Sequence, residues 1–549
     1  MSTSAIESAL PVAESSDMTF RQTALLTIGS LAIVCAAILF LARASVGVDR
    51  KSPAPSPSQP REKPGTVVSN SPADLALTRD INRTIDESDL TQARWGVFVM
   101  SMNDGRVVYS RNSDKLFTPA SNMKVYTTAV ALDSLGADYR WRTSVYADKQ
   151  PNDGIVEGDV TLYGRGAPEL RSTRRGDAPS LDQLADQIYQ SGVRQVRGNV
   201  VGDESYFRGE LYGLGWQWND LQWYFGAEPS ALTVDENSFE LTISPANKSG
   251  SAANLAITRN TGFVHLTNNT ATTQRDATTA IGINRGLTDN EVRVWGEFPV
   301  SGRAFSAFLS IHNPALWAAT LFKQALIARG IKVDGQPRSR DFRVAETDKF
   351  DPQKAIEVAY QDSEPLGEIV RQTNKESNNL FAELILRTLG RERGSSAPDP
   401  DPRKSRTRGD DEAGTAVVKS WLDHADIRTR GLAIRDGSGL SRLDLVTPES
   451  TAQLLTAIAR TNSAPVFHDS LPIAGRDGTL VGRLRREAGR IFAKTGTLTY
   501  DHSLSGYVDT KNGEVLVFSI FCNDVTGPSD AVRVIDEIAG LLAEFGPAK

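Results

Sequence analysis

Ser121-Asn122-Met123-Lys124 begins the stretch SNMKVYTTAVALDSLG (121–136), in which apolar residues recur at helical spacing. The pattern predicts a helix that starts at the serine and ends at Gly136. Because Ser121 and Lys124 are three residues apart, they share one face of that helix. A serine becomes a nucleophile when a neighbouring base takes its proton, and a lysine can be that base if its pKa is depressed. Alone, the pattern far more often describes a helix with a capping serine and a solvent-facing lysine.

A second motif, Ser377-Asn378-Asn379, precedes the apolar-rich stretch Leu380–Leu389, which predicts a helix closed by Gly390. Ser377 and Asn379 offer a hydroxyl and an amide, the groups needed for proton relay and for contacts with a substrate amide. Ser-x-Asn is a weak signal by itself. It gains meaning from its place between the other two motifs.

The third motif, Lys494-Thr495-Gly496, lies in a predicted strand over 490–497. Its ammonium and hydroxyl groups can bind a carboxylate, and we expect the glycine to leave room for a substrate backbone. Lys494 is also the candidate cation that lowers the pKa of Lys124. The N–H of the next residue, Thr497, can join that of Ser121 in stabilising an oxyanion. The ordered set indicates a serine acyl-transferase that acts on a peptide with a free C-terminus.

Working outward from the motifs, the sequence predicts an α+β fold. Two N-terminal strands and three C-terminal strands form one antiparallel five-stranded sheet, with helices on its faces and an all-helical part that bears the second motif. The predicted strands cover 95–102, 106–109, 490–497, 503–509 and 514–521. We assign the catalytic domain to 73–137 and 346–549, and a large, mainly β, two-lobed insertion to 138–345. The charged stretch 391–414 predicts an exposed loop, and 531–545 a closing helix.

The N-terminus predicts a membrane attachment. Residues 1–22 are polar, 23–42 form an uncharged apolar run long enough for a transmembrane anchor, and 43–72 are a Pro/Ser-rich linker. A long signal sequence cleaved after Ala44 is the alternative. The charges around the run favour a cytoplasmic body. The chemistry below requires an extracytoplasmic or periplasmic one, and we give the chemistry precedence.

The composition of the chain argues against several classes of function. A chain of 549 residues exceeds one compact core, and a formal net charge of −6 argues against a nucleic-acid partner. The two cysteines, Cys35 and Cys522, are expected to be unpaired thiols. The five histidines form no metal-spaced pair, so no metal or cofactor is expected.

The three motifs in this order resemble those of the penicilloyl-serine transferases, which include penicillin-binding proteins and serine β-lactamases. The chain is most similar to the class C low-molecular-mass D-alanyl-D-alanine carboxypeptidases and endopeptidases, in which a large insertion separates the first two motifs. Further stretches carry the resemblance over about 75–545: Pro119-Ala120-Ser121, Gly202-Asp203, Ser205-Tyr206-Phe207, Gly215-Trp216, Trp218-Asn219-Asp220, Ala231-Leu232, Glu236-Asn237, Asp436-Gly437-Ser438-Gly439-Leu440-Ser441, Ala474-Gly475 and Asp477-Gly478-Thr479-Leu480. Gly166-Ala167-Pro168 departs from the Gly-Asp-Pro of many relatives.

The resemblance implies a role for each site residue. Ser121 is acylated, Lys124 is its base, and Ser377 with Asn379 relays protons and contacts the substrate amide. Lys494 and Thr495 hold the terminal carboxylate. Asp220 either reaches the free amine of the peptide's third residue or caps its own loop.

The expected function is that of a membrane-tethered, extracytoplasmic serine D-alanyl-D-alanine carboxypeptidase/endopeptidase. It would act on peptidoglycan stem peptides and be acylated by β-lactams. Two alternatives remain open. A serine β-lactamase would need a further base for fast deacylation, and none is evident. A non-catalytic cell-wall binder or β-lactam sensor would not need an activated serine.

Overall fold

The computed structural model describes residues 68–176, 178–275, 278–343, 347–348, 350–395, 409–527 and 530–546. The chain divides into two units, 1–65 and 66–549, and all described residues belong to the second. The predicted anchor 23–42 lies outside them. Within the described ranges, no helix has both the length and the apolarity needed to cross a bilayer.

An antiparallel five-stranded sheet joins the two ends of the second unit, in the order β17-β18-β19-β1-β2. This confirms the predicted sheet. Its strands are β1 (Arg94–Ser101), β2 (Val107–Arg111), β17 (Ile491–Thr497), β18 (His502–Asp509) and β19 (Val515–Asn523).

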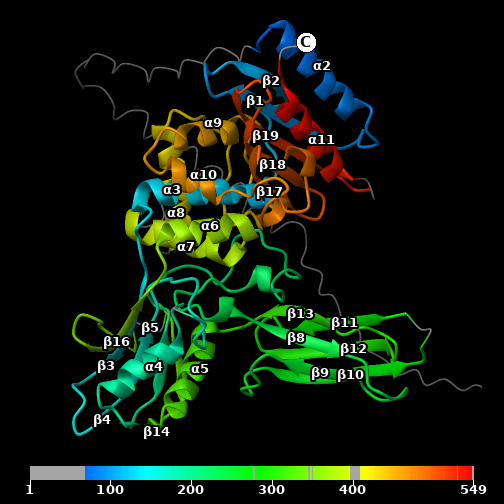
Figure 1. Cartoon of the computed structure of the whole chain (residues 1–549). Helices are drawn as coiled ribbons and strands as arrows, with labels where there is room; N and C mark the ends of the chain where they lie inside the picture. Colours follow the sequence, from blue (N-terminus) through cyan, green and yellow to red (C-terminus); the bar gives the residue numbers. More distant parts are fainter. Residues whose placement is uncertain are drawn as a thin grey trace, which may run out of the picture. The chain divides into compact units, whose positions relative to one another are not determined.

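The sheet is covered on both faces because its central strands are apolar on both sides. In β1, Val97 and Val99 pack in one core with the terminal helices α2 (Pro72–Asp86) and α11 (Ala531–Glu544). Phe98, between them in sequence, points to the other core. Helices α2 and α11 contact each other, although they come from opposite ends of the unit (Figure 1).

The helical part packs against the second face of the sheet. It comprises α3 (Met123–Leu135), α6 (Leu366–Glu376), α7 (Asn379–Arg393), α8 (Asp410–His424), α9 (Pro448–Ile458) and α10 (Ala464–Ser470). Its core is continuous with Phe98 and Phe521 of the sheet. Helix α3 is buried over its first ten residues. The nucleophile motif is therefore held at the junction of sheet and helices.

Two expectations about this part were wrong. Gly390 does not end α7, which continues to Arg393. A Cβ at Gly390 would overlap the Asp410 carbonyl of α8, so the glycine permits close contact between two helices. Of the loop predicted over 391–414, residues 396–408 lie outside the described residues, but 391–393 belong to α7 and 410–414 begin α8, where Asp410 and Glu412 suit the positive end of the helix dipole.

Between α3 and α6 the described residues form four further sheets and two α-helices. The larger sheet has the order β15-β7-β5-β3-β16, and three-stranded sheets have the orders β10-β12-β11, β13-β8-β9 and β14-β6-β4. The elements are β3 (Arg142–Ala147), β4 (Ile155–Val156), β5 (Val160–Tyr163), α4 (Leu181–Gln190), β6 (Gln195–Val196), β7 (Val200–Asp203), β8 (Ser238–Ser244), β9 (Asn254–Ile257), β10 (His265–Thr273), β11 (Ala280–Arg285), β12 (Glu291–Pro299), β13 (Phe305–Ser310), α5 (Pro314–Ala328), β14 (Lys332–Val333), β15 (Pro337–Arg340) and β16 (Ile356–Asp362).

Strand β16 lies beyond residue 345, where the sequence placed the end of the insertion. It pairs with β3 near the start of the insertion, so the chain leaves this region next to where it entered. The buried apolar residues of the region form a core of their own. We refer to Arg142–Asp362 as the insertion.

Candidate active site

Ser121 lies in the 3-10 turn η1 (Ala120–Asn122), directly before α3. Ala120 has φ +49°, an uncommon conformation for a residue with a side chain. A Cβ on Gly439 would overlap the Ala120 carbonyl, so only glycine allows that loop to approach the turn. The serine is half-buried at a sharp bend, where its hydroxyl is accessible to a reacting group.

Lys124 is fully buried behind the serine, and its Nζ donates three hydrogen bonds. The acceptors are Ser121 Oγ at 2.9 Å, Asn379 Oδ1 at 2.6 Å and the Ser438 carbonyl at 2.7 Å. Burial lowers the pKa of Lys124 to about 7, because desolvation disfavours the charged ammonium, although the Asp436 and Glu383 carboxylates oppose the change. A substantial fraction of this lysine is neutral at neutral pH, as a general base requires.

The second motif occupies the junction of two helices. Ser377 is the C-cap of α6 with φ +60°, and Asn378 caps the start of α7 by accepting from the Phe381 N–H. Asn379 is the first residue of α7, and its side chain joins Lys124 to the Phe225 carbonyl, to which its Nδ2 donates at 2.9 Å. Ser377 and Asn379 therefore approach the two lysines of the other motifs.

Lys494, on β17, is as buried as Lys124 and donates to Ser377 Oγ and to the Thr495 carbonyl, both at 2.8 Å. Burial, and next the like charge of Lys124, hold the pKa of Lys494 well below its usual range. The sequence left two causes open for a depressed pKa of Lys124, burial or a nearby cation such as Lys494. In the structure, burial is the dominant cause at Lys124, and the like-charge effect acts on Lys494.

Gly496 makes a close packing contact that the sequence did not predict. A Cβ there would overlap Ser503 Oγ and would lie 2.7 Å from the Pro119 carbonyl and 3.1 Å from the Ser121 nitrogen. The glycine thus lets β17 pack against the nucleophile turn, and its expected role in leaving room for a substrate backbone stays a prediction. Thr495 donates to Thr479 Oγ1 at 2.8 Å, and Thr497 is exposed where β17 ends.

Two residues that tie the site together were not among the predicted site residues. Asn122, inside the first motif and fully buried, donates to the Lys494 carbonyl at 3.1 Å and to Ser503 Oγ at 2.6 Å. Glu383, one turn after Asn379 on α7, accepts from the N–H groups of Gly437 and Ser438 and so holds the carbonyl that receives Lys124. The one sequence signal for these residues is their spacing from the motifs: Asn122 directly follows Ser121, and Glu383 lies four residues after Asn379.

Asp220 lies in the insertion, on the segment that reaches the second motif through Phe225. It is nearly buried, and its Oδ2 has no hydrogen-bond partner among the described residues. Burial raises the pKa of Asp220, while the charge of Arg442 opposes this. The Arg442 guanidinium donates at 3.3 Å to Gln217 and at 3.4 Å to Thr499, just beyond β17, while its Nη1 is buried without a partner in the described part of the chain.

Lys124 hydrogen-bonds to Ser121 and Asn379, and Lys494 hydrogen-bonds to Ser377, while Asn122 links the nucleophile turn to the Lys494 carbonyl. This arrangement can deprotonate the Ser121 hydroxyl and present donors to an anionic group. The described residues include no cluster of His, Cys, Asp or Glu side chains arranged to hold a metal ion.

Comparison with known proteins adds an independent finding. Residues 77–545 match the model of the D-Ala-D-Ala carboxypeptidase 3 (S13) family. A D-alanyl-D-alanine carboxypeptidase of Actinomadura sp. (strain R39) is 34% identical over 482 residues, which cover 85% of each chain. The D-alanyl-D-alanine carboxypeptidase DacB of Haemophilus influenzae is 26% identical, over 80% of this chain and 88% of its own. The crystal structure of penicillin-binding protein 4 from that organism has a similar fold, with a TM-score of 0.72 at 23% identity, over 85% of this chain and all of the other.

Proposed function

The chain belongs to the D-Ala-D-Ala carboxypeptidase 3 (S13) family, and from this premise we propose how its own residues carry out the reaction. The activity class, a serine-type D-Ala-D-Ala carboxypeptidase, follows from the family. Our proposal concerns the roles of Ser121, Lys124, Ser377, Asn379 and Lys494, the substrate and the location. We propose that the substrate is a peptidoglycan stem peptide, cut either at its D-alanyl-D-alanine end or at a cross-link.

In the proposed reaction, neutral Lys124 takes the Ser121 proton while Oγ attacks the carbonyl of the penultimate D-alanine. The N–H groups of Ser121 and Thr497 face the developing oxyanion. When the tetrahedral intermediate collapses, the C–N bond breaks and the leaving amine takes a proton relayed through Ser377. Water then attacks the ester, and the acyl-enzyme is hydrolysed as Ser121 Oγ regains its proton.

The observation that carries this proposal is the 2.9 Å contact between Ser121 Oγ and Lys124 Nζ, together with a Lys124 pKa of about 7. An exposed lysine, with a pKa near 10.4, would be almost wholly charged at neutral pH and could not accept a proton. Lys494 takes the substrate carboxylate in the same proposal, with Thr495 beside it. Burial holds the pKa of Lys494 low, and a bound carboxylate raises it, because an opposite charge favours the ammonium form.

We assign the binding of the peptide's third residue to Asp220 and Arg442. Each has a buried polar atom without a partner among the described residues, and the two groups carry opposite charges. Such a pair suits the amine of a diamino acid at Asp220. A carboxylate on the same side chain, where the diamino acid has one, suits Arg442. The support is the placement of Asp220 on the segment that also contacts Asn379 through Phe225.

The location of the substrate implies that the catalytic body is extracytoplasmic. We assign 23–42 to an anchor in the cytoplasmic membrane, with 43–72 as its tether, on the apolar length of the first and the Pro/Ser-rich composition of the second. Protease accessibility in intact spheroplasts tests this assignment. Protection of the catalytic body from an external protease would overturn it.

Labelling with a fluorescent penicillin tests the acyl-enzyme. The full chain should carry one label per molecule, Ser121→Ala should carry none, and Ser301→Ala, an exposed serine of the insertion, should label like the parent. The parent should also release D-alanine from a stem pentapeptide. Equal labelling of the parent and Ser121→Ala would remove Ser121 from the mechanism. Rapid loss of label with release of hydrolysed penicillin would favour the β-lactamase alternative.

A further inference from the structure

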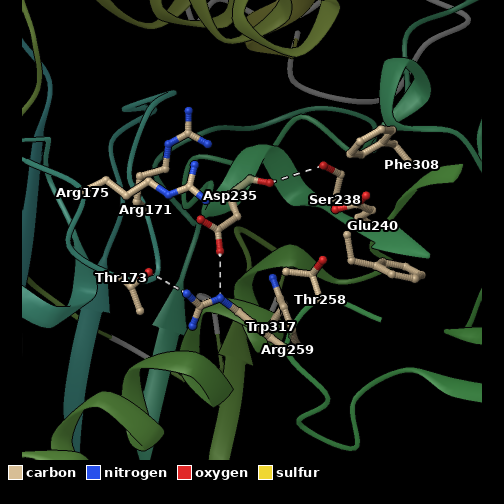
Figure 2. A pocket seen from close by; sticks show the side chains of 11 residues that line it. Arg171, Thr173, Arg175, Asp235, Ser238, Glu240, Thr258, Arg259, Phe308 and Trp317 are labelled. Carbon is tan, nitrogen blue, oxygen red and sulfur yellow. Dashed lines mark hydrogen bonds and ion pairs between the residues drawn. The ribbon is translucent and has the colours of Figure 1, made fainter. Parts of the chain in front are cut away.

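A second polar cavity lies in the insertion, away from the catalytic motifs. Its volume is about 210 Å³, and it opens between the loop after β5, the turn before β8, the start of α5 and the loop after β9. Figure 2 shows Arg171 and Arg175 on one side of the cavity and Phe308 and Glu240 on the other, with Asp235 between them. Trp317 and Arg259 line it from α5 and from the loop after β9.

Several polar groups of this cavity are already satisfied by neighbours. Asp235 accepts from the Ser172 backbone N–H at 3.1 Å and lies 3.8 Å from the Arg259 guanidinium, which also donates to Thr173 at 2.6 Å. Arg171 lies 3.5 Å from the Glu236 carboxylate. These contacts build and stiffen the walls, so the cavity is preformed.

Three groups remain without partners among the described residues. The Trp317 Nε1–H belongs to a side chain that is 2% exposed, and this buried donor makes no hydrogen bond. Burying a donor without an acceptor costs roughly 1–3 kcal/mol, so a ligand that accepts from it recovers that energy. No hydrogen bond or ion pair within the described ranges involves the side chains of Arg175 and Glu240.

The free groups specify a ligand with two charges. A carboxylate can accept from Arg175 and from Trp317, while an ammonium group can meet Glu240. A phosphate dianion would face two carboxylates, Asp235 and Glu240, and fits less well. The cavity is smaller than the roughly 300–1,000 Å³ of pockets for drug-sized ligands, so it admits one or two amino-acid residues. Phe308, which is 49% exposed, offers an apolar face at the rim.

The cavity is also joined to the catalytic centre. Asp235 faces the cavity, and the next residue, Glu236, accepts a hydrogen bond from Asn378 of the second motif at 2.9 Å. Asp235, Glu236 and Asn237 all have positive φ, an unusual run of strained residues in a turn. Phe308 contacts Tyr224, whose neighbour Phe225 accepts from Asn379. A ligand in the cavity therefore lies against the segments that hold the second motif.

We infer that this cavity is a second peptide-binding site, which takes the carboxylate- and amine-bearing end of a further stem peptide of the polymer while the catalytic centre holds the first. The inference rests on the proposed function for the identity of the ligand. The site itself rests on Arg175, Trp317 and Glu240. It gives the insertion a role in holding polymeric substrate.

The test uses the full chain acylated at Ser121 with benzylpenicillin, so that the catalytic centre is blocked. A soluble stem pentapeptide with free amine and carboxylate groups is titrated calorimetrically, and intact mass measures the adduct on the same sample. We expect one peptide per acylated molecule. Arg175→Ala and Trp317→Phe should each weaken binding about tenfold or more, since a hydrogen bond to a charged group contributes about 1.5–3 kcal/mol.

Arg174→Ala is the matched control. Arg174 is the adjacent arginine, it does not line the cavity, and its guanidinium lies 3.6 Å from Asp186. It should bind peptide like the parent. Absence of binding to fully acylated parent would overturn the inference, as would equal effects of Arg175→Ala and Arg174→Ala. If an equal concentration of inorganic phosphate displaced the peptide, the proposal that the cavity binds the end of a peptide would be wrong.

The experiment distinguishes a failure of the acyl-enzyme proposal from a failure of the cavity proposal. A sample without the penicillin adduct would contradict the acyl-enzyme. The peptide titration of that sample would still decide the cavity, because the difference between Arg175→Ala and Arg174→Ala does not depend on Ser121.

Discussion

The catalytic centre and the cavity of the insertion treat buried polar groups in opposite ways. Lys124 is fully buried and has three hydrogen-bond acceptors, and Asn379 uses both ends of its amide. In the cavity, the buried Trp317 N–H has no partner within the described ranges, and Arg175 faces open space. Asn122 Oδ1, Asp220 Oδ2 and Arg442 Nη1 around the catalytic centre are also buried without partners in the described ranges, so the contrast concerns the side chains of Lys124 and Asn379.

The two regions also differ in the contacts that hold their side chains in place. In the catalytic centre, side chains from α3, the α6–α7 junction and β17 bind one another directly. The insertion reaches the second motif through the Glu236 side chain and the Phe225 carbonyl. If the centre is complete in itself, changes within it should have far larger effects on catalysis than changes in those contacts from the insertion.

The largest effect is expected at Lys124. Lys124→Ala removes the base and leaves the Asn379 and Ser438 acceptors buried without a donor, so the rate of acylation by penicillin should fall about 10²–10⁴-fold. Stopped-flow measurement of acylation tests this. Lys115→Ala, an exposed lysine paired with Asp114, is the control and should keep the parent rate. A loss of less than about tenfold would mean that another group acts as base.

The second-largest effect is expected from a glycine substitution in β17. Gly496→Ala forces a methyl group against Ser503 Oγ and the Pro119 carbonyl, which displaces the turn that carries Ser121. We expect a loss of about 1–3 kcal/mol in the free energy of unfolding from the overpacking, and about 10²-fold slower acylation from the displaced nucleophile. Gly482→Ala, where a Cβ meets nothing within 4 Å, is the matched control. Unchanged acylation in Gly496→Ala would show that this contact does not position the serine.

Much of the catalytic half could be predicted from sequence, because its chemistry demands particular residue types at particular spacings. The five-stranded sheet also followed from alternation and turn signals, such as those around Asn512-Gly513. The roles of individual site residues stay predictions until variants are measured. So do the domain boundaries.

What failed depended on contacts between distant segments. Gly390 resembles a helix stop in sequence, but its partner is Asp410 on another helix. The close contacts of Gly496 with Ser503 and Pro119, and that of Asn122 with Lys494, were not predicted either. The cavity was not foreseen at all, because Arg175, Trp317 and Glu240 belong to three segments with no common motif. Local patterns predict elements, whereas such pairs appear only once the chain is folded.

The pH dependence of acylation should be set by the catalytic centre and not by the insertion. Lys124 must be neutral to accept a proton, and its pKa is about 7. The acylation rate should therefore fall on the acid side, approaching tenfold per pH unit below about pH 6, and level off above about pH 8. Measuring the rate from pH 5 to pH 9 in the parent and in Arg175→Ala tests both points. A rate that stays flat to pH 5.5 would contradict Lys124 as the base, and a shifted midpoint in Arg175→Ala would link the cavity to it.

The smallest expected effect is the one that decides how independent the two regions are. Glu236→Ala removes the acceptor of the Asn378 side chain, one of the two contacts by which the insertion reaches the second motif. Hydrogen bonds to charged groups contribute about 1.5–3 kcal/mol, and this part-buried one should lie at the low end, so acylation should slow by about tenfold. Glu236→Gln, which keeps an acceptor oxygen, should recover most of the rate.

Glu291→Gln, at an exposed position on β12, is the control and should leave the acylation rate unchanged. If Glu236→Ala slowed acylation as much as Lys124→Ala, the second motif would depend on the insertion for its geometry, and the centre could not be regarded as complete in itself. If Glu236→Ala had no effect, the second motif would be held by α6, α7 and its contacts with Lys124 and Lys494 alone. The strained turn would then serve only the cavity on its other side, since Asp235 lines that cavity and Glu236 holds Arg171.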